Sequence, residues 1–138
     1  MPVHPESNLS MSSPVEENRS LAIKFIERMM PCGGIDEDLI SDDFRWWAPG
    51  LGYSDKTKMK ALIDHLKPIM PQMPEMTVAG STVEGERVAL EVSGKCELAD
   101  GSRYDNHYHF LIFVRDGRVR LVKEYTDTKL AYDTFGKL

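Results

Sequence analysis

An Asp-Gly pair between two β-prone runs constrains the fold of this chain more than any other feature. Asp116-Gly117 separates the run Tyr104–Val114 from the run Val119–Thr126. Glycine tolerates the positive φ that a tight turn requires, so the pattern predicts a β-hairpin. The first run would extend for about 36 Å at about 3.3 Å per residue. A strand of this length predicts a curved sheet that other elements cover.

The first run of the hairpin divides into a polar half, Asp105–His109, and an apolar half, Phe110–Val114. Both alternating phases of the apolar half are apolar, which predicts that both faces of the sheet are covered there. One cover is the core of the domain, and we expect the other to be the second subunit of a homodimer. The polar half continues the same two faces, so some of its groups are expected to line a cavity or an interface.

Glu124 on the second run has a cross-strand partner that depends on the register of the hairpin. A two-residue turn pairs Glu124 with His109, and a three-residue turn with a glycine bulge pairs it with Tyr108. The sequence leaves both registers open. Either one places an imidazole or a phenol directly opposite the carboxylate. At the surface such a pair contributes about 0.2–1 kcal/mol, whereas in a cavity the two groups can exchange protons.

The composition is that of one globular domain. The chain has 138 residues, of which 41% are hydrophobic and 28% charged, with a formal charge of −5. This balance predicts neither a nucleic-acid partner nor a membrane span, which needs about 18 apolar residues in succession. The first residues lack the pattern of a signal peptide. Cys32 and Cys96 have no paired spacing, so we interpret them as reduced thiols of a cytoplasmic protein and expect no metal site.

Hydrophobic periodicity predicts the order of the elements. Residues 1–12 are expected to be a mobile tail and residues 13–138 the folded domain. The expected elements are a helix opened by Ser13-Pro14, a short strand Phe44–Trp47, a helix from Ser54, strands Thr77–Val83 and Arg87–Leu98, the hairpin, and a helix Thr128–Phe135. This order predicts an α+β cone: a curved antiparallel sheet of four long strands plus a short one, covered by two or three N-terminal helices and a short C-terminal helix.

The segment from Phe44 to Tyr53 carries much aromatic surface for a stretch that contains proline and glycine. Two interpretations remain open for it. One tryptophan can cap the core, or Trp47 and Tyr53 can form the wall of a pocket for an apolar ligand.

The hairpin also resembles a known family. YDNHYHFLIFVRD and the following GRVRLVKEYTDTKLAYDTFG are similar to the SnoaL-like and ketosteroid-isomerase-like branch of the nuclear transport factor 2-like superfamily. The similarity is most specific in the segments Lys123–Thr128 and Asn106-x-Tyr108. The order of the expected elements matches that of the family over about residues 14–136. The resemblance implies a fold but no single reaction, because the superfamily hosts isomerases, cyclases, dehydratases, epoxide hydrolases and non-enzymes.

The catalytic sets of the better-known members are incomplete in this chain. Phe25 stands where the steroid isomerases have a tyrosine, and Ala48 where they have an aspartate base. Glu91-Val92-Ser93 stands near the Arg-x-Asp pair of limonene-type epoxide hydrolases. Glu124 alone has an equivalent, the last-strand carboxylate that SnoaL-type cyclases also carry. We therefore favour lyase or dehydratase chemistry among the possible reactions.

The sequence thus predicts a cofactor-free acid–base enzyme that acts on a small, largely apolar, aromatic or polycyclic substrate. Glu124 would be the general acid or base, because desolvation in an aromatic-lined cone raises the pKa of a carboxyl. His109 and Tyr108 would be its proton partners. The residues expected to contact the substrate are Trp47, Tyr53, Asn106, His107, Phe25 and Val122.

Other functions of the same scaffold remain open. The chain could be an isomerase or a cyclase, or a non-catalytic module for small-ligand binding or dimerisation. A metal site is not expected, because His107 and His109 lack a credible third ligand, and phosphate-binding glycine loops are absent.

Overall fold

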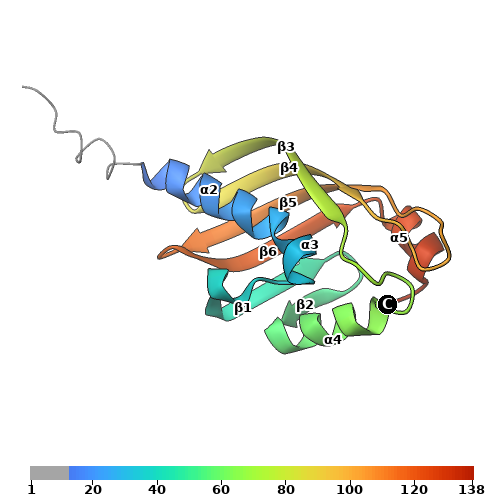
Figure 1. Cartoon of the computed structure of the whole chain (residues 1–138). Helices are drawn as coiled ribbons and strands as arrows, with labels where there is room; N and C mark the ends of the chain where they lie inside the picture. Colours follow the sequence, from blue (N-terminus) through green and yellow to red (C-terminus); the bar gives the residue numbers. More distant parts are fainter. Residues whose placement is uncertain (1–12) are drawn as a thin grey trace, which may run out of the picture.

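A single strongly curved sheet dominates the fold (Figure 1). The computed structural model describes residues 13–138, so the predicted tail, residues 1–12, lies outside the described residues. The strand order is β2-β1-β6-β5-β4-β3. Neighbouring strands are antiparallel except β1 and β6, which are parallel. The strands are β1 Ile40–Ala48, β2 Gly52–Asp55, β3 Glu75–Glu84, β4 Arg87–Lys95, β5 Asn106–Arg115 and β6 Arg118–Thr126.

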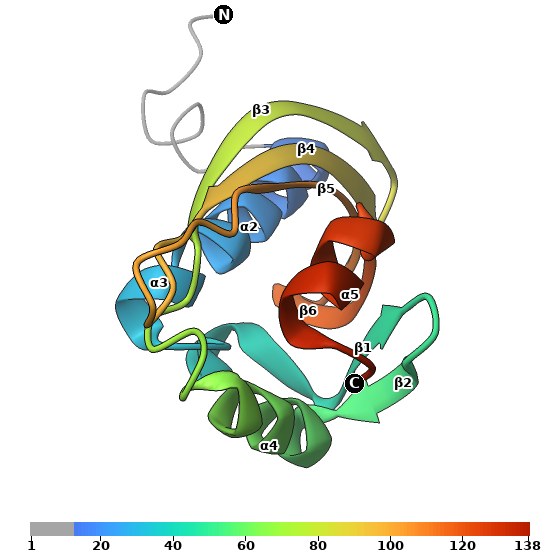
Figure 2. The same cartoon turned by 90° about the vertical axis from the view of Figure 1, so that its right-hand side faces the viewer.

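The helices cover the inner, concave face of this sheet and its open end. They are α2 Pro14–Glu27, α3 Met29–Cys32, the 3₁₀ turn η1 Glu37–Leu39, α4 Lys56–Leu66 and α5 Thr128–Phe135. Helix α2 lies within the curve of the sheet, and α4 and α5 lie on two sides of the open end (Figure 2). The predicted α+β cone is confirmed. The short strand β2, which pairs with β1, is an addition to the predicted elements.

Helix α2 begins as its sequence predicts. Ser13 Oγ accepts a hydrogen bond from the backbone N–H of Glu16 at 3.1 Å, and Pro14 occupies the first helical position. Such a cap satisfies a backbone donor that would otherwise lack a partner. The buried face of the helix consists of Ala22, Phe25 and Ile26, so α2 fills the concave side of the sheet.

The turn of the central hairpin has the two residues of the first predicted register. Asp116 and Gly117 both adopt positive φ, 52° and 72°, and Arg115 pairs with Arg118 across them. Left-handed conformations at both central positions are typical of a turn that matches the twist of the flanking strands.

A bulge in β6 then makes both predicted registers of Glu124 wrong. The pairing shifts between Phe113 and Val114, which leaves Arg120 as an extra residue in β6. An inserted residue moves every side chain beyond it by one position. Glu124 therefore pairs with Phe110, and neither His109 nor Tyr108 lies directly opposite it.

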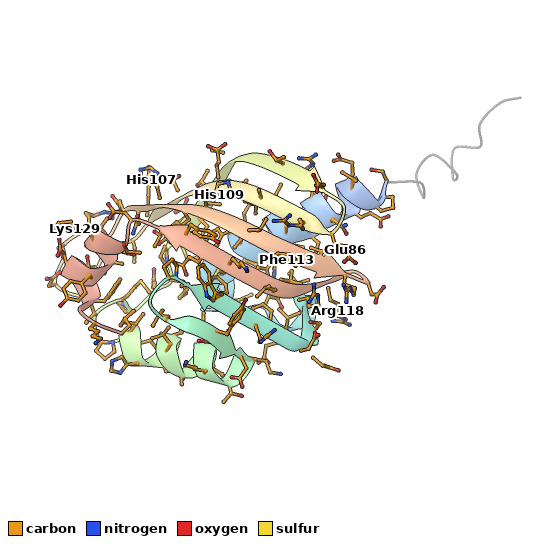
Figure 3. All side chains as sticks on the ribbon, turned by 180° about the vertical axis from the view of Figure 1, so that it is seen from behind. Glu86, His107, His109, Phe113, Arg118 and Lys129 are labelled. Atoms are coloured by element: carbon orange, nitrogen blue, oxygen red, sulfur yellow. The ribbon has the colours of Figure 1, made fainter. Side chains whose placement is uncertain are left out.

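The shift decides which face of the sheet carries which groups. Tyr108 and Phe110 are buried on the inner face. His107 and His109 alternate with them and are exposed on the other face (Figure 3). Since Glu124 is opposite Phe110, its side chain belongs to the inner face with Tyr108.

Two further sequence expectations concern the cysteines and membranes. Cys32 is exposed and Cys96 is buried, and neither forms a disulfide. The compartment in which the protein resides stays a prediction. Within residues 13–138, no helix is long and apolar enough to cross a membrane.

Candidate active site

An apolar cavity of about 360 Å³ occupies the open end of the cone. This volume is in the usual range for small-molecule sites. Its wall is formed by the inner faces of β1, β5 and β6, by α4, and by α5 with the residues after it. Five methionines contribute to the wall: Met29, Met59, Met70, Met73 and Met76. Methionine side chains are flexible and polarizable, so such a wall can adapt to ring systems of different shape.

Glu124 brings a carboxyl group to this apolar wall. The indole Nε1 of Trp46 donates a hydrogen bond to Glu124 Oε1 at 2.9 Å. Burial among apolar groups raises the pKa of Glu124, and the hydrogen bond from Trp46 opposes this in part. The raised pKa follows because a low-dielectric environment disfavours the charged form. Among the described residues no salt bridge pairs a cation with this carboxyl.

Two phenols lie on the same side of the cavity. Tyr108 stacks on Phe110 with ring centroids 5.2 Å apart and an interplanar angle of 6°. Burial is the main reason that the pKa of Tyr108 is raised, with Tyr104 and Glu124 adding to it. Burial also raises the pKa of Tyr104. Both phenols therefore keep their protons at neutral pH, so each has a hydroxyl that can donate a hydrogen bond to a ligand.

Asn106, which does not line the cavity, fixes the position of the Tyr104 phenol. It is only 2% exposed, and its Nδ2 donates to Tyr104 Oη at 2.9 Å and to the Asp127 carbonyl at 3.2 Å. Its Oδ1 accepts from the backbone N–H of His107 at 2.7 Å. We predicted Asn106 as an orienter of the substrate, but it does not line the cavity and instead orients Tyr104.

Gly94 on β4 gives the Tyr108 ring the space it occupies. A Cβ atom on Gly94 would lie 2.8 Å from Tyr108 Cε2 and 3.2 Å from Met76 Sδ. Real carbon atoms do not approach so closely, so only glycine at this strand position lets the ring reach its place on the wall.

The predicted histidines lie away from the cavity. His107 and His109 are exposed on the outer face of β5 (Figure 3). The expectation that an imidazole faces Glu124 in a cavity is therefore wrong. The reason is the bulge at Arg120, which a count of residues from the turn does not include.

Trp47 and Tyr53 also lie outside the cavity, contrary to the pocket-wall interpretation. Trp47 packs on Tyr125 of β6, with ring centroids 5.4 Å apart, and Lys123 Nζ lies 5.6 Å from the Trp47 ring. Tyr53 is 47% exposed and has the Arg45 guanidinium over its ring at 4.7 Å. These residues belong to the outer face of the sheet.

Phe25 and Val122, expected to contact the substrate, are fully buried in the core and do not line the cavity. Phe25 instead packs against Trp46, with ring centroids 6.4 Å apart. Of the predicted site residues, the structure brings only Glu124 and Tyr108 to the cavity wall.

The sequence reasoning missed Trp46, Tyr104 and the wall provided by α5. For Trp46 a signal was available: it alternates in phase with Phe44, whereas Trp47 shares its phase with the charged Arg45. An apolar phase of a strand faces the core. For Tyr104 and α5 no local pattern indicates the cavity, since their position depends on how the end of the cone closes.

Potential metal ligands do not gather in this region. Over residues 13–138, no group of three or more His, Cys, Asp or Glu side chains could hold a metal ion.

A curved, mostly antiparallel sheet covered by helices, with an apolar cavity at its open end, is the architecture of the nuclear transport factor 2-like α+β cones. Within that superfamily, the chain belongs to the SnoaL-like domain family, whose model matches residues 34–122. No curated protein sequence matches this chain significantly.

Several solved structures share the fold. A putative SnoaL-like polyketide cyclase from Jannaschia sp. CCS1 is 17% identical, with a TM-score of 0.71 over 92% of this chain and 97% of that one. The pinacolase BvnE from Penicillium brevicompactum is 15% identical, with a TM-score of 0.74 over 91% and 94%. AclR, a putative hydroxylase from Streptomyces galilaeus, is 18% identical, with a TM-score of 0.72 over 90% and 87%. At these identities the similarity shows the fold alone.

Proposed function

We propose that this protein is an acid–base enzyme of the lyase or dehydratase type that uses its own side chains and no cofactor. Its substrate would be a small, largely apolar, aromatic or polycyclic molecule bound in the cavity. The observation that carries the proposal is the carboxyl of Glu124, placed on an apolar wall and held by Trp46 through one oxygen.

The chemistry follows from the protonation properties of the wall. A carboxyl with a raised pKa can take a proton from a carbon atom and give it to a leaving hydroxyl group, which departs as water. In such a cycle Glu124 returns to its starting state. Tyr108 would keep its own proton and donate a hydrogen bond to an oxygen of the substrate, because its pKa is strongly raised by burial.

The apolar lining and the named relatives support the choice of substrate. The methionine-rich wall offers dispersion contacts to rings but few polar partners. Structural neighbours include proteins named as a polyketide cyclase and a pinacolase. The first of these names supports the inclusion of polyketide-type compounds in the screen, and the reaction is left to experiment.

Turnover by a Glu124→Gln variant tests the function. Ring-bearing alcohols and enones would be screened for turnover beside a ligand-binding assay. Glutamine keeps the size of the side chain and an acceptor for Trp46 but cannot exchange a proton at neutral pH. We expect a loss of about 10²–10⁴ in rate with binding retained. Glu91→Gln, on the exposed outer face of β4, is the matched control and should retain full activity.

Two results would overturn this proposal. Full turnover by Glu124→Gln would remove the residue from the mechanism. Ligand binding by the wild-type protein without turnover of any compound in the screen would favour the alternative of a non-catalytic binding module.

We further propose that the outer face of the sheet is the interface of a homodimer. This face carries partly exposed apolar side chains on adjacent strands: Trp47, Tyr53, Leu111, Phe113, Leu121 and Tyr125. An apolar surface of this kind is stabilised by a partner. Sedimentation at micromolar concentration should show a dimer, and a monomer there would refute the proposal.

A further inference from the structure

Helix α5 forms one wall of the cavity although none of its residues is fully buried. Thr128, Ala131, Tyr132 and Phe135 contribute to the cavity lining, together with the three residues that follow the helix. By contrast, alternate residues of β5, which also contributes to the cavity wall, are buried. An element with little buried apolar surface opens at a lower free energy than the strands of the core.

Asn106 holds the beginning of this helix. The Asp127 carbonyl accepts the first hydrogen bond of α5, from Ala131 N at 3.2 Å, and also the bond from Asn106 Nδ2 at 3.2 Å. The Asp127 carboxylate caps the helix by accepting from Leu130 N at 3.1 Å. Asp127 alone connects β6 to α5, so it is the point about which the helix can turn.

Tyr104 holds the end of the helix. Its ring packs edge-on against Phe135, with ring centroids 4.7 Å apart. The hydroxyl of the same tyrosine accepts from Asn106 Nδ2 at 2.9 Å. Asn106 and Tyr104 thus contact both ends of α5 and each other, and both are buried.

We infer that α5 is a gate of the cavity, hinged at Asp127 and held closed by the Asn106–Tyr104 pair, through which an apolar ligand enters and leaves. The inference rests on the cavity being a ligand site and does not require any particular reaction. Asn106 and Tyr104 are positioning residues in this role, since they act through the helix.

Hydrogen exchange of the free, full-length protein tests the gate directly. We expect the amides of α5 to exchange by local opening, faster than the paired amides of β5. Tyr104→Phe keeps the ring but removes the phenol oxygen that bonds to Asn106. It should accelerate exchange in α5 about 5-fold, the usual effect of one hydrogen bond, and leave β5 unchanged.

A second variant and a matched control separate a gate from general destabilisation. Phe135→Ala removes the aromatic contact at the end of α5 and should accelerate exchange there by 10-fold or more. Lys129→Ala removes the exposed Lys129–Asp133 pair on the same helix and should change exchange by no more than about twofold. Equal acceleration in α5 and β5 of the Phe135 variant would mean that the helix opens only with the whole domain, and would overturn the inference.

Binding kinetics of 1-naphthol, followed by fluorescence, test the passage of a ligand. If α5 is the gate, Phe135→Ala raises both the association and the dissociation rate constants, and Lys129→Ala raises neither. A faster dissociation with an unchanged association rate would identify Phe135 as a wall contact only and refute the gate. These measurements need no turnover, so a failure of the proposed reaction leaves their outcome unaffected.

Discussion

Trp46 and Glu124, which are 78 positions apart in the sequence, are joined by a 2.9 Å hydrogen bond from indole Nε1 to Oε1. The parallel pairing of β1 and β6 creates this contact, since Trp46 is opposite Val122 and Glu124 follows two residues later on the same face. The bond holds the carboxyl at the cavity and partly offsets the effect of burial on its pKa.

Trp46→Phe should therefore shift the pH dependence of activity. The indole N–H stabilises the charged form of Glu124, so its removal raises the pKa of this carboxyl further. If the ionised form is the base, the acid limb of the kcat/KM profile moves to higher pH. Profiles of wild type and variant, measured from pH 4 to 9, check this expectation. An unmoved acid limb would show that Trp46 is only a packing residue.

Glu124→Gln should stabilise the protein at neutral pH. The folded-state pKa of Glu124 lies above its unfolded value, so the folded protein binds the proton more tightly. Wild type consequently loses stability as the pH rises from the unfolded towards the folded pKa, and this loss persists above it. The neutral glutamine is not subject to this loss.

Thermal unfolding at two pH values checks whether the variant is more stable than wild type at neutral pH. The Tm of the variant should exceed that of wild type at pH 8, by about 4 °C per kcal/mol, and the gap should close near pH 3. A lower Tm of the variant at pH 8 would instead indicate a structural carboxylate that the described contacts do not explain.

Gly94→Ala should damage the cavity without replacing a titratable group. The added methyl would overlap the Tyr108 ring, which must shift or the strand must bend. Overpacking of this kind costs about 1–3 kcal/mol. Chemical denaturation should show this loss, and ligand affinity per folded molecule should fall as well. Gly80→Ala is the control on the neighbouring strand, where the nearest atom is the carboxylate end of the exposed Glu91 side chain.

The two adjacent tryptophans should respond differently to alanine substitution. Trp46→Ala should weaken binding of an apolar ligand, because the indole lines the cavity. Trp47→Ala should leave affinity unchanged and weaken the dimer, because Trp47 packs with Tyr125 on the outer face. Titration with 1-naphthol and sedimentation of both variants distinguish the two roles, and weaker binding in the Trp47 variant would restore the original pocket-wall interpretation.

The sequence by itself determined the fold and most of its local elements, although it missed the short strand β2. Helix α5 has the predicted bounds Thr128–Phe135, and Asp127 caps it, because caps and helical spacing act within a few residues. In β4, Val88, Leu90 and Val92 alternate with more exposed residues in the sequence, and all three are buried. Glu124 and Tyr108 were selected from the same hairpin, and the structure brings both to the cavity wall.

The tertiary structure decided which other side chains contact Glu124 and Tyr108. Side chains of a strand alternate between the two faces with a period of two. The single extra residue at Arg120 therefore changes the cross-strand partner of Glu124 from the predicted His109 to Phe110. The spacing of three between the buried Val119 and Val122 marks the bulge once the structure is known, but a residue count cannot place it. The contact of Trp46 with Glu124 depends on the pairing of β1 with β6, and the closure of the cavity by α5 depends on Tyr104 and Asn106. Such contacts join distant segments, and no local pattern encodes them.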